Sequence, residues 1–296
     1  MIMQDRYLTS EQAAAYLKIK ERKLYELVGA GRIPATKVTG KWLFPVTALD
    51  RWLEAGLVIP PGYAPELPPM IIAGSQDPLL DWAAQRSQSG LALLAEGSEA
   101  GLRHLERNEA AIAAIHLHAL DNAADDTNIA AVRASPDLAD AVVIRFAERE
   151  QGLMMRKDQN VDSLQSALSQ NLVFGFRQKG AGAQLLLDKM VAAEGRELAT
   201  IKHRALAYST GEDLAFAIAS AQIDCGLATR AVAEQASLAF IPLLWEQFDL
   251  VMRRRSFFEA APQKFFAFLR TDAFQVHARA LGGYKTDQAG EVKFNR

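Results

Sequence analysis

Five prolines fall within the thirteen residues Leu57–Pro69, which read LVIPPGYAPELPP. Proline has no backbone N–H and a fixed φ, so this stretch can form neither a helix interior nor a central strand. Proline-rich segments act instead as semi-rigid spacers between folded parts. The 296 residues are therefore expected to form two units, an N-terminal domain over 1–56 and a larger domain over 70–296, joined by a linker over 57–69.

The N-terminal unit begins with a helix signal. Thr9, followed three residues later by Gln12, has the pattern of a capping box, and an alanine-rich apolar face comes next. A short turn around Ile19 leads to a second amphipathic segment, Glu21–Val28, which glycines terminate. These signals predict a helix, a tight turn and a second helix.

A hairpin and a third helix are expected to follow. The segments Ile33–Val38 and Lys41–Pro45 are short apolar runs on either side of Thr39-Gly40. A glycine-containing two-residue turn between such runs favours a β-hairpin. Val46–Leu53 then shows helical spacing of apolar residues. The first 56 residues are therefore predicted to form a winged helix-turn-helix domain, mainly α with a β-hairpin wing.

The charge of the chain is unevenly distributed. Residues 1–60 hold nine Lys or Arg and six Asp or Glu, a net charge of +3, whereas the remainder carries −5. A recognition helix presents the residues of its first turns to base edges in the major groove. The alternative is a three-helix module that binds protein and has a solvated basic face. The candidate DNA contacts on the two helices and the wing are Thr9, Lys20, Arg22, Lys23, Tyr25, Thr36, Lys37 and Lys41.

The run LTSEQAAAYLKIKERKLYELVGAGRIPATKVTGKWLFPVTALDRWL resembles the excisionase/MerR-like winged helix-turn-helix family over about 50 residues. The resemblance implies binding to an operator in double-stranded DNA. Because a single head of this kind contacts few base pairs, a homodimer or a higher homo-oligomer is expected.

From Met70 onward, apolar runs alternate with polar turns and amphipathic helices. Such alternation is typical of an α/β fold with mainly parallel sheets. Glu148-Arg149-Glu150 is interpreted as a break between two strands. Helices are predicted at 79–88 and 100–108, after the glycine-rich turn at 178–182, from 212 to 221, and over 262–281. Strands are predicted at 70–73, 91–95, 111–118, 141–147, 152–155, 172–177, 205–208, 223–228, 240–244 and 248–253.

Several polar turns follow predicted strands and precede predicted helices. In α/β sheets ligands lie at the carboxyl ends of strands, where hydroxyl groups and helix N-termini suit an anion. Arg177 would add a permanent charge, although it could instead pair with a carboxylate, and the serines could be plain N-caps. His116 shares a strand face with His118, and one of the two could reach the ligand. The candidate ligand contacts are Ser75, Gln76, Ser98, His116, Arg177, Gly180, Ala181, Gly182, Ser209 and Thr210.

The motifs AGSQDPLLDWAA, EGSEAGLRHLERNEAAIAAIHLH, GFRQKGAGAQLLLDKM and AIASAQIDCGLATRAVAEQASLAFIPLLWEQFDLVMRR follow one another in an order that resembles the periplasmic-binding-protein type 2 superfamily, in its form fused to helix-turn-helix domains. The resemblance covers roughly residues 70–290. It implies a two-lobed α/β domain, with one lobe over about 70–148 and 243–296 and the other over about 149–242. The effector would lie in the cleft between the lobes.

The resemblance also bears on the effector. Relatives that bind molybdate or tungstate tend to have a GSGT-like run after the arginine, where this chain has Gly180-Ala181-Gly182-Ala183 without hydroxyl groups. The effector is expected to be a small anion, either an oxyanion such as molybdate or tungstate or a small organic acid. The missing hydroxyl groups favour a small organic anion, or a more apolar metabolite, over a tetrahedral oxyanion.

Other features bear on location and chemistry. The longest apolar runs, such as LALLA, are far shorter than the ~20 residues that span a bilayer, and the N-terminus lacks the pattern of a secretory signal. The single cysteine, Cys225, fits a reducing compartment. We expect a cytoplasmic protein without membrane attachment. The sequence shows no catalytic triad spacing, P-loop or metal-ligand cluster, so neither catalysis, a cofactor nor a metal is expected.

The combined pattern predicts a ligand-responsive DNA-binding transcriptional regulator. One alternative is an excisionase-like architectural or partner-binding protein whose C-terminal domain only oligomerises. Another is an enzyme on a binding-protein fold, for which His116, His118 and Glu212 are the only loose candidates.

Overall fold

The computed structural model describes residues 7–37, 40–56, 67–117 and 126–296. The chain divides into two compact units, Met1–Glu66 and Leu67–Arg296. Most of the expected linker, as well as Val38, Thr39 and His118, lies outside the described residues.

The described residues of the N-terminal unit form three helices, α1 (Ser10–Tyr16), α2 (Glu21–Gly29) and α3 (Val46–Ala55). The predicted capping box is confirmed, because Thr9 Oγ1 accepts from Gln12 N and Gln12 Oε1 accepts from Thr9 N. The helices enclose a small core of Ala13, Ala14, Leu24, Ile33, Phe44 and Leu49.

The wing is shorter than the sequence predicts. Its two predicted strands are joined in the described residues only by an isolated bridge between Thr36 and Leu43. The strand β2 (Phe44–Pro45) pairs instead with β1 (Tyr7–Leu8), a strand that the sequence did not predict. Phe44 explains this pairing, because it is fully buried in the small core and draws its strand toward α1.

The larger unit is built on one sheet, with strand order β4-β3-β5-β10-β6-β9-β7-β8, to which β11 (Tyr284–Lys285) and β12 (Val292–Asn295) add by pairing with β6. Parallel pairing joins β3 (Ile71–Gly74) to both β4 (Ala92–Ala95) and β5 (Ile112–Ile115). A second parallel group consists of β7 (Phe174–Arg177), β8 (His203–Tyr208) and β9 (Cys225–Thr229). The α/β fold was thus predicted correctly, but the expectation of a mainly parallel sheet was wrong, because β10 pairs antiparallel with β5 and β6, and β6 pairs antiparallel with β9.

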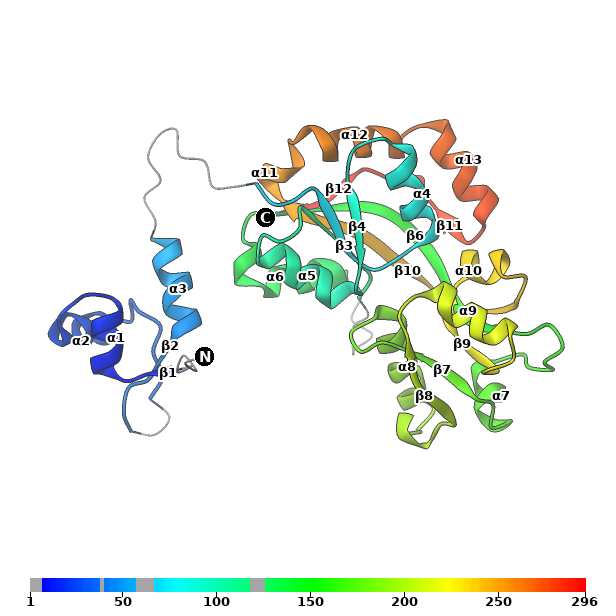
Figure 1. Cartoon of the computed structure of the whole chain (residues 1–296), viewed down its shortest axis with the longest axis horizontal. Helices are drawn as coiled ribbons and strands as arrows, with labels where there is room; N and C mark the ends of the chain where they lie inside the picture. Colours follow the sequence, from blue (N-terminus) through cyan, green and yellow to red (C-terminus); the bar gives the residue numbers. More distant parts are fainter. Residues whose placement is uncertain (1–6, 38–39, 57–66, 118–125) are drawn as a thin grey trace. The chain divides into compact units, whose positions relative to one another are not determined.

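Two long antiparallel strands join these parallel groups: β6 (Ala141–Met155) and β10 (Ala239–Arg253), each of 15 residues. Figure 1 shows both running from one group of helices to the other. The prediction of separate strands at 141–147 and 152–155, and at 240–244 and 248–253, was wrong. Glu148-Arg149-Glu150 continues the strand because Arg149 is buried and paired with carboxylates rather than exposed in a turn.

Helices pack against both parallel groups of strands: α4 and α5 contact the group of β3, β4 and β5, and α8 and α9 contact the group of β7, β8 and β9. Helices α6, α7, α10 and α11 were not predicted from the sequence. The helices of the larger unit are α4 (Pro78–Arg86), α5 (Ser98–Glu106), α6 (Thr127–Ala134), α7 (Leu164–Ser169), α8 (Gly182–Ala193), α9 (Gly211–Ala219), α10 (Arg230–Gln235), α11 (Arg254–Phe257), α12 (Ala260–Leu269) and α13 (Asp272–Leu281), with 3₁₀ turns at Pro136–Leu138 and Leu198–Thr200.

The apolar core of the larger unit is divided. Two of its apolar clusters are each formed by residues from both 70–147 and 248–294. The two other clusters are formed by residues from 153–244. These separate cores support the proposal of two lobes, with boundaries near residues 148 and 243.

Close packing of α5 on β3 gives a prediction about Gly101. A Cβ on this helical glycine would lie 2.7 Å from Gly74 Cα and 2.8 Å from Ala73 O. Gly101→Ala should therefore lower the free energy of unfolding by about 1–3 kcal/mol, although alanine is the better helix former. Gly29→Ala, at the end of α2 with no atom within 4 Å, is the control and should be neutral or stabilising. Equal thermal stability of the two variants would contradict this packing.

Candidate functional site

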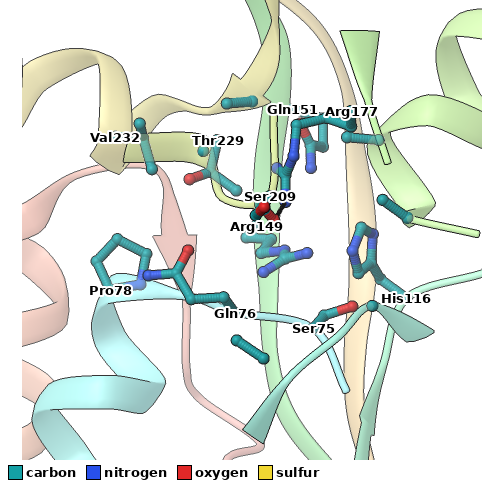
Figure 2. Close-up of a pocket in the computed structure, with 16 residues that line it drawn as sticks. Ser75, Gln76, Pro78, His116, Arg149, Gln151, Arg177, Ser209, Thr229 and Val232 are labelled. Atoms are coloured by element: carbon teal, nitrogen blue, oxygen red, sulfur yellow. Dashed lines mark hydrogen bonds between the residues drawn. The ribbon is translucent and has the colours of Figure 1, made fainter. Parts of the chain in front are cut away.

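A cavity of about 30 Å³ lies within the larger unit, where the carboxyl ends of strands from both parallel groups meet the starts of helices. Figure 2 shows side chains from several elements directed around it. Its lining residues are Ser75, Gln76, Pro78, Ala95, Gly97, His116, Arg149, Gln151, Arg177, Ala181, Ala183, Ser209, Gly211, Ala228, Thr229 and Val232.

The fold places helix N-termini at this cavity. Pro78 opens α4, Gly97 precedes α5, Ala181 precedes α8 and Gly211 opens α9, and all four residues line the cavity. The first backbone N–H groups of a helix have no partner within the helix and carry the positive end of its dipole. At α4 the Asp77 carboxylate already accepts from Leu79 N and Leu80 N, so the starts of α5, α8 and α9 are the ones that leave backbone donors toward the cavity.

Arg149 forms the most buried part of the wall, with 1% of its surface exposed. Its Nε donates to Glu246 Oε1 at 2.5 Å, its Nη1 donates to Asp77 Oδ2 at 2.8 Å, and its guanidinium lies 4.0 Å from the centre of the Phe248 ring. Burial alone would lower the pKa of Arg149, but the charges of Glu246 and Asp77 raise it above the ordinary value. Within the described residues Nη2 has no hydrogen-bond partner, which makes it a donor available to a ligand.

Arg177, at the end of β7, is the second arginine of the cavity. Its Nε and Nη2 donate to the backbone oxygens of Tyr208 and Ser209, at 3.1 and 2.8 Å, and it pairs with no carboxylate in the described part of the chain. Burial lowers the pKa of Arg177 to about 10. The side chain thus remains charged at neutral pH, and this charge is balanced only at longer range.

Next to the cavity, hydrogen bonds of Ser98 link the segments that follow the strands β3, β4 and β5. Its Oγ lies 2.8 Å from Ser75 Oγ and within hydrogen-bond distance of both N and O of His116. His116 Nδ1 in turn lies 3.1 Å from Glu246 Oε2. This buried network fixes Ser75 and His116 at the cavity.

His116 also meets the second parallel group of the sheet. A Cβ on Gly182, at the start of α8, would lie 2.3 Å from His116 Cε1 and 2.4 Å from His116 O. Only glycine allows this approach, so Gly182 lets the two halves of the cavity close on each other.

Of the ten ligand contacts predicted from the sequence, six line the cavity and four do not. Ser98 is fully buried behind Ser75, Gly180 faces Glu99, and Gly182 packs on His116. Thr210 is engaged in a capping box with Asp213 at the start of α9, so its hydroxyl serves the helix. The six that line the cavity are Ser75, Gln76, His116, Arg177, Ala181 and Ser209.

Sequence reasoning missed Arg149, Gln151 and Thr229. Arg149 and Gln151 were placed at a break in the chain, whereas they lie two residues apart on β6 and thus share a face. Thr229 ends β9 and precedes α10, which is the same strand-to-helix signal that identified Ser75.

Gln76 joins the two halves of the cavity through acidic partners. Its Nε2 donates to Asp81 Oδ2 and to Glu212 Oε1, both at 2.8 Å. Burial, together with the charges of Asp77 and Glu212, raises the pKa of Asp81 to about 6. The Asp81 carboxyl group therefore binds its proton more tightly in the folded protein than in the unfolded chain. As a result, the free energy of unfolding falls as the pH rises from about 4 to about 6.

Asp81→Asn should remove the loss of stability that ionisation of the buried Asp81 carboxyl group causes above pH 6. We expect the variant to be more stable than the unmodified protein at pH 7.5 by about 1–2 kcal/mol, after allowance for partial exposure, and equally stable near pH 4. Asp287→Asn, at an exposed position, is the control and should be neutral at both pH values. Urea denaturation at the two pH values measures the difference, and an Asp81→Asn variant with unchanged pH dependence would contradict the assignment.

The N-terminal unit carries a groove of about 590 Å³ between its helices and the wing. Thr9, Tyr25, Lys37 and Lys41, four of the predicted DNA contacts, line it. Lys20 is exposed as the N-cap of α2, and Thr36 bridges to Leu43 in the wing. On α2, Arg22 and Lys23 are exposed and both pair with Glu26, at 3.5 and 3.3 Å. Such exposed pairs contribute little, so both cations can turn to phosphates.

Two further observations concern the described residues. No helix among them is long and apolar enough to cross a membrane. They also contain no group of three or more His, Cys, Asp or Glu side chains that could hold a metal ion.

Comparison with known families defines the class of the chain. A model of the PBP superfamily domain matches residues 81–270, and a model of a helix-turn-helix domain matches residues 7–56. The chain therefore belongs to the PBP superfamily and carries an N-terminal helix-turn-helix domain. A DNA-binding domain joined to a ligand-binding domain indicates a ligand-responsive regulator rather than an enzyme.

Individual relatives are distant. The uncharacterised protein YvgK of Bacillus subtilis (strain 168) is 23% identical over 301 residues, which cover 96% of each chain. A substrate-binding protein assigned to a phosphate ABC transporter of Clostridium perfringens, solved with bound phosphate, matches 73% of this chain and 98% of its own (TM-score 0.55, 11% identity). PhnD1 from Prochlorococcus marinus, in complex with methylphosphonate, matches 75% of this chain and 95% of its own (TM-score 0.50, 12% identity). At such identities the two structures establish the fold alone.

Proposed function

We propose that this protein is a transcriptional regulator that binds a small anion in the cavity of its larger domain and thereby changes its affinity for an operator in double-stranded DNA. The anion is an oxyanion, such as molybdate or tungstate, or a small organic acid. The active form is a homodimer or a higher homo-oligomer, since a single helix-turn-helix head contacts few base pairs.

The observation that carries the anion assignment is the pair of arginines in the cavity wall. Arg177 has no carboxylate partner within the described residues, and Arg149 keeps Nη2 available although it is almost fully buried. Charge-assisted hydrogen bonds from guanidinium groups are among the strongest that a protein offers to an anion. The starts of α5, α8 and α9 add backbone donors that suit the same charge.

The means of coupling is differential binding. The anion can shift the protein between two forms only by the difference in its affinity for them. His116 and Gly182, which belong to different halves of the larger unit, pack against each other beside the cavity, so a ligand that contacts both halves would favour this closed arrangement. The closed form would then present the DNA-binding heads of an oligomer in a different spacing.

Anion binding can be tested by thermal denaturation of the full chain with a panel of oxyanions, carboxylates and phosphonates. A specific ligand present at 100 times its Kd should stabilise the folded protein by about 2.7 kcal/mol. A panel that produced no concentration-dependent stabilisation would contradict the proposal that the cavity binds a small anion.

DNA binding gives a separate prediction. Binding to a fragment of the protein's own promoter should weaken steeply with salt, and Arg22→Gln with Lys23→Gln should reduce the slope of log K against log salt by about 1 for each phosphate that is no longer neutralised. Lys157→Gln, at an exposed lysine of the larger unit, is the control and should leave the slope unchanged. Fluorescence anisotropy at several salt concentrations measures the slopes, and salt-independent binding would exclude this surface as the DNA interface.

A further inference from the structure

Two glutamines in the cavity wall are held in a defined orientation by carboxylates. Gln76 Nε2 donates both of its hydrogens, one to Asp81 Oδ2 and one to Glu212 Oε1, each at 2.8 Å. Gln151 Nε2 donates to Glu246 Oε1 at 3.0 Å. A carboxylate accepts hydrogen bonds and cannot donate them, so the nitrogen of each amide must face its acidic partner.

The amide oxygens of these glutamines are therefore left for other partners. Gln151 is 2% exposed, and its Oε1 is buried without a hydrogen-bond partner among the described residues. Gln76 Oε1 likewise accepts no hydrogen bond in the described part of the chain. Because both residues line the cavity, the wall presents two acceptors in addition to the donors of Arg149 and Arg177.

Thr229 adds a third polar group at the same place. It faces Gln151 directly across the antiparallel pair of β6 and β9, so their side chains lie on one face of the sheet. Thr229 is 6% exposed, lines the cavity, and its Oγ1 also has no partner among the described residues. Buried polar groups are normally satisfied, and two neighbouring exceptions in one cavity wall point to a ligand.

We propose that the anion bound in this cavity also carries a hydrogen-bond donor, a hydroxyl or an ammonium group, that meets the amide oxygens of Gln151 and Gln76. This inference rests on the proposed function and narrows it. The effector class is a hydroxy- or amino-substituted small carboxylate or phosphonate, whose anionic group faces the arginines. Sulfate, molybdate and tungstate have no donor at neutral pH and would leave both acceptors unpaired.

Matched ligand pairs test this directly in the full chain. Isothermal titration calorimetry at pH 8 compares propionate with lactate and alanine, succinate with malate, and methylphosphonate with aminomethylphosphonate. Each comparison keeps the anionic group and adds a donor, which is a neutral hydroxyl in lactate and malate and a cationic ammonium group in alanine and aminomethylphosphonate. A site built to bond an O–H or N–H discriminates strongly against the analogue that lacks it. The preferred ligand should bind at least about 10-fold more tightly than its donor-free partner, and more tightly than sulfate or molybdate.

A substitution of Gln151 then tests whether this residue is responsible for the preference for donor-bearing ligands. Gln151→Met should weaken the donor-bearing ligand by at least about 10-fold and its donor-free partner by less than about threefold. Gln184→Met is the control, because this buried glutamine bonds Arg177 N and Asp188 through both ends of its amide and does not line the cavity. It should affect both ligands of a pair equally.

Two results would overturn the proposal in different ways. If sulfate, molybdate or a donor-free ligand binds as tightly as the best donor-bearing one, the donor requirement is wrong while anion sensing stands. If no anion of the panel binds at all, the proposed anion site itself fails. The ligand comparison uses the unmodified protein, so it remains decisive even if Gln151→Met does not fold.

Discussion

Replacing Arg149 with methionine is expected to lower the free energy of unfolding by about 3–5 kcal/mol and to abolish anion binding. The loss follows from burial, because Arg149 is the charge between Asp77 and Glu246, which are 1% and 4% exposed. Without the guanidinium, two carboxylates are left buried close together without their cation, which is far more costly than the loss of a surface ion pair. Tyr284, whose hydroxyl donates to Asp77 Oδ2, cannot replace the missing charge.

Urea denaturation followed by circular dichroism measures this effect. Arg103→Met is the matched control, because Arg103 is 56% exposed and lies 3.9 Å from Glu99 in an i,i+4 pair on α5. Its cost should stay within about 0.5 kcal/mol. An Arg149→Met protein as stable as Arg103→Met would show that the buried network does not depend on its central charge.

Replacing Arg177 with methionine should have the opposite profile, a large loss of binding with little loss of stability. Arg177 holds only two backbone oxygens and no carboxylate among the described residues, so its removal strands no buried charge. Removing one member of a buried charge-assisted contact to a ligand costs about 2–5 kcal/mol, and 2.7 kcal/mol corresponds to about 100-fold in Kd. The affinity for the best-binding anion should therefore fall about 100-fold or more.

Calorimetric titration of that anion tests the effect. Arg204→Met is the control, since Arg204 lies exposed on the neighbouring strand β8 and also donates to a backbone oxygen, that of Gln222. The Arg204→Met variant should bind the anion with the same affinity as the unmodified protein. If Arg177→Met also binds within threefold of the unmodified protein, Arg177 does not contact the anion.

The sequence predicts those parts of the structure that depend on local chemistry. The Thr9 cap needs only Gln12 three residues on, and Arg177 could be placed near a ligand because it ends an apolar strand before a glycine-rich turn. The same rule would have found Thr229, which ends β9 in front of α10. Strand-to-helix turns are thus informative even in a single sequence.

What could not be predicted depends on partners that are distant in the chain. Arg149 sits between two glutamates and has the local pattern of an exposed turn. Its burial depends on Asp77 and Glu246, which are 72 and 97 residues away in sequence. The pairing of β1 with β2 is of the same kind, because Tyr7 and Pro45 pair although α1 and α2 lie between them in the chain. Hydrophobic pattern and turn chemistry carry no information on such contacts.

The central claim is that an anion in the cavity changes DNA affinity, and one measurement tests it most directly. Fluorescence anisotropy with a labelled promoter fragment is recorded at fixed salt, with and without a saturating concentration of the anion that most stabilises the protein. We expect the Kd for DNA to change at least fivefold in the unmodified protein, within the usual range of coupling between two sites, and to stay constant in Arg177→Met. A DNA affinity that the anion leaves unchanged in the unmodified protein, although it binds and stabilises the larger domain, would contradict this account.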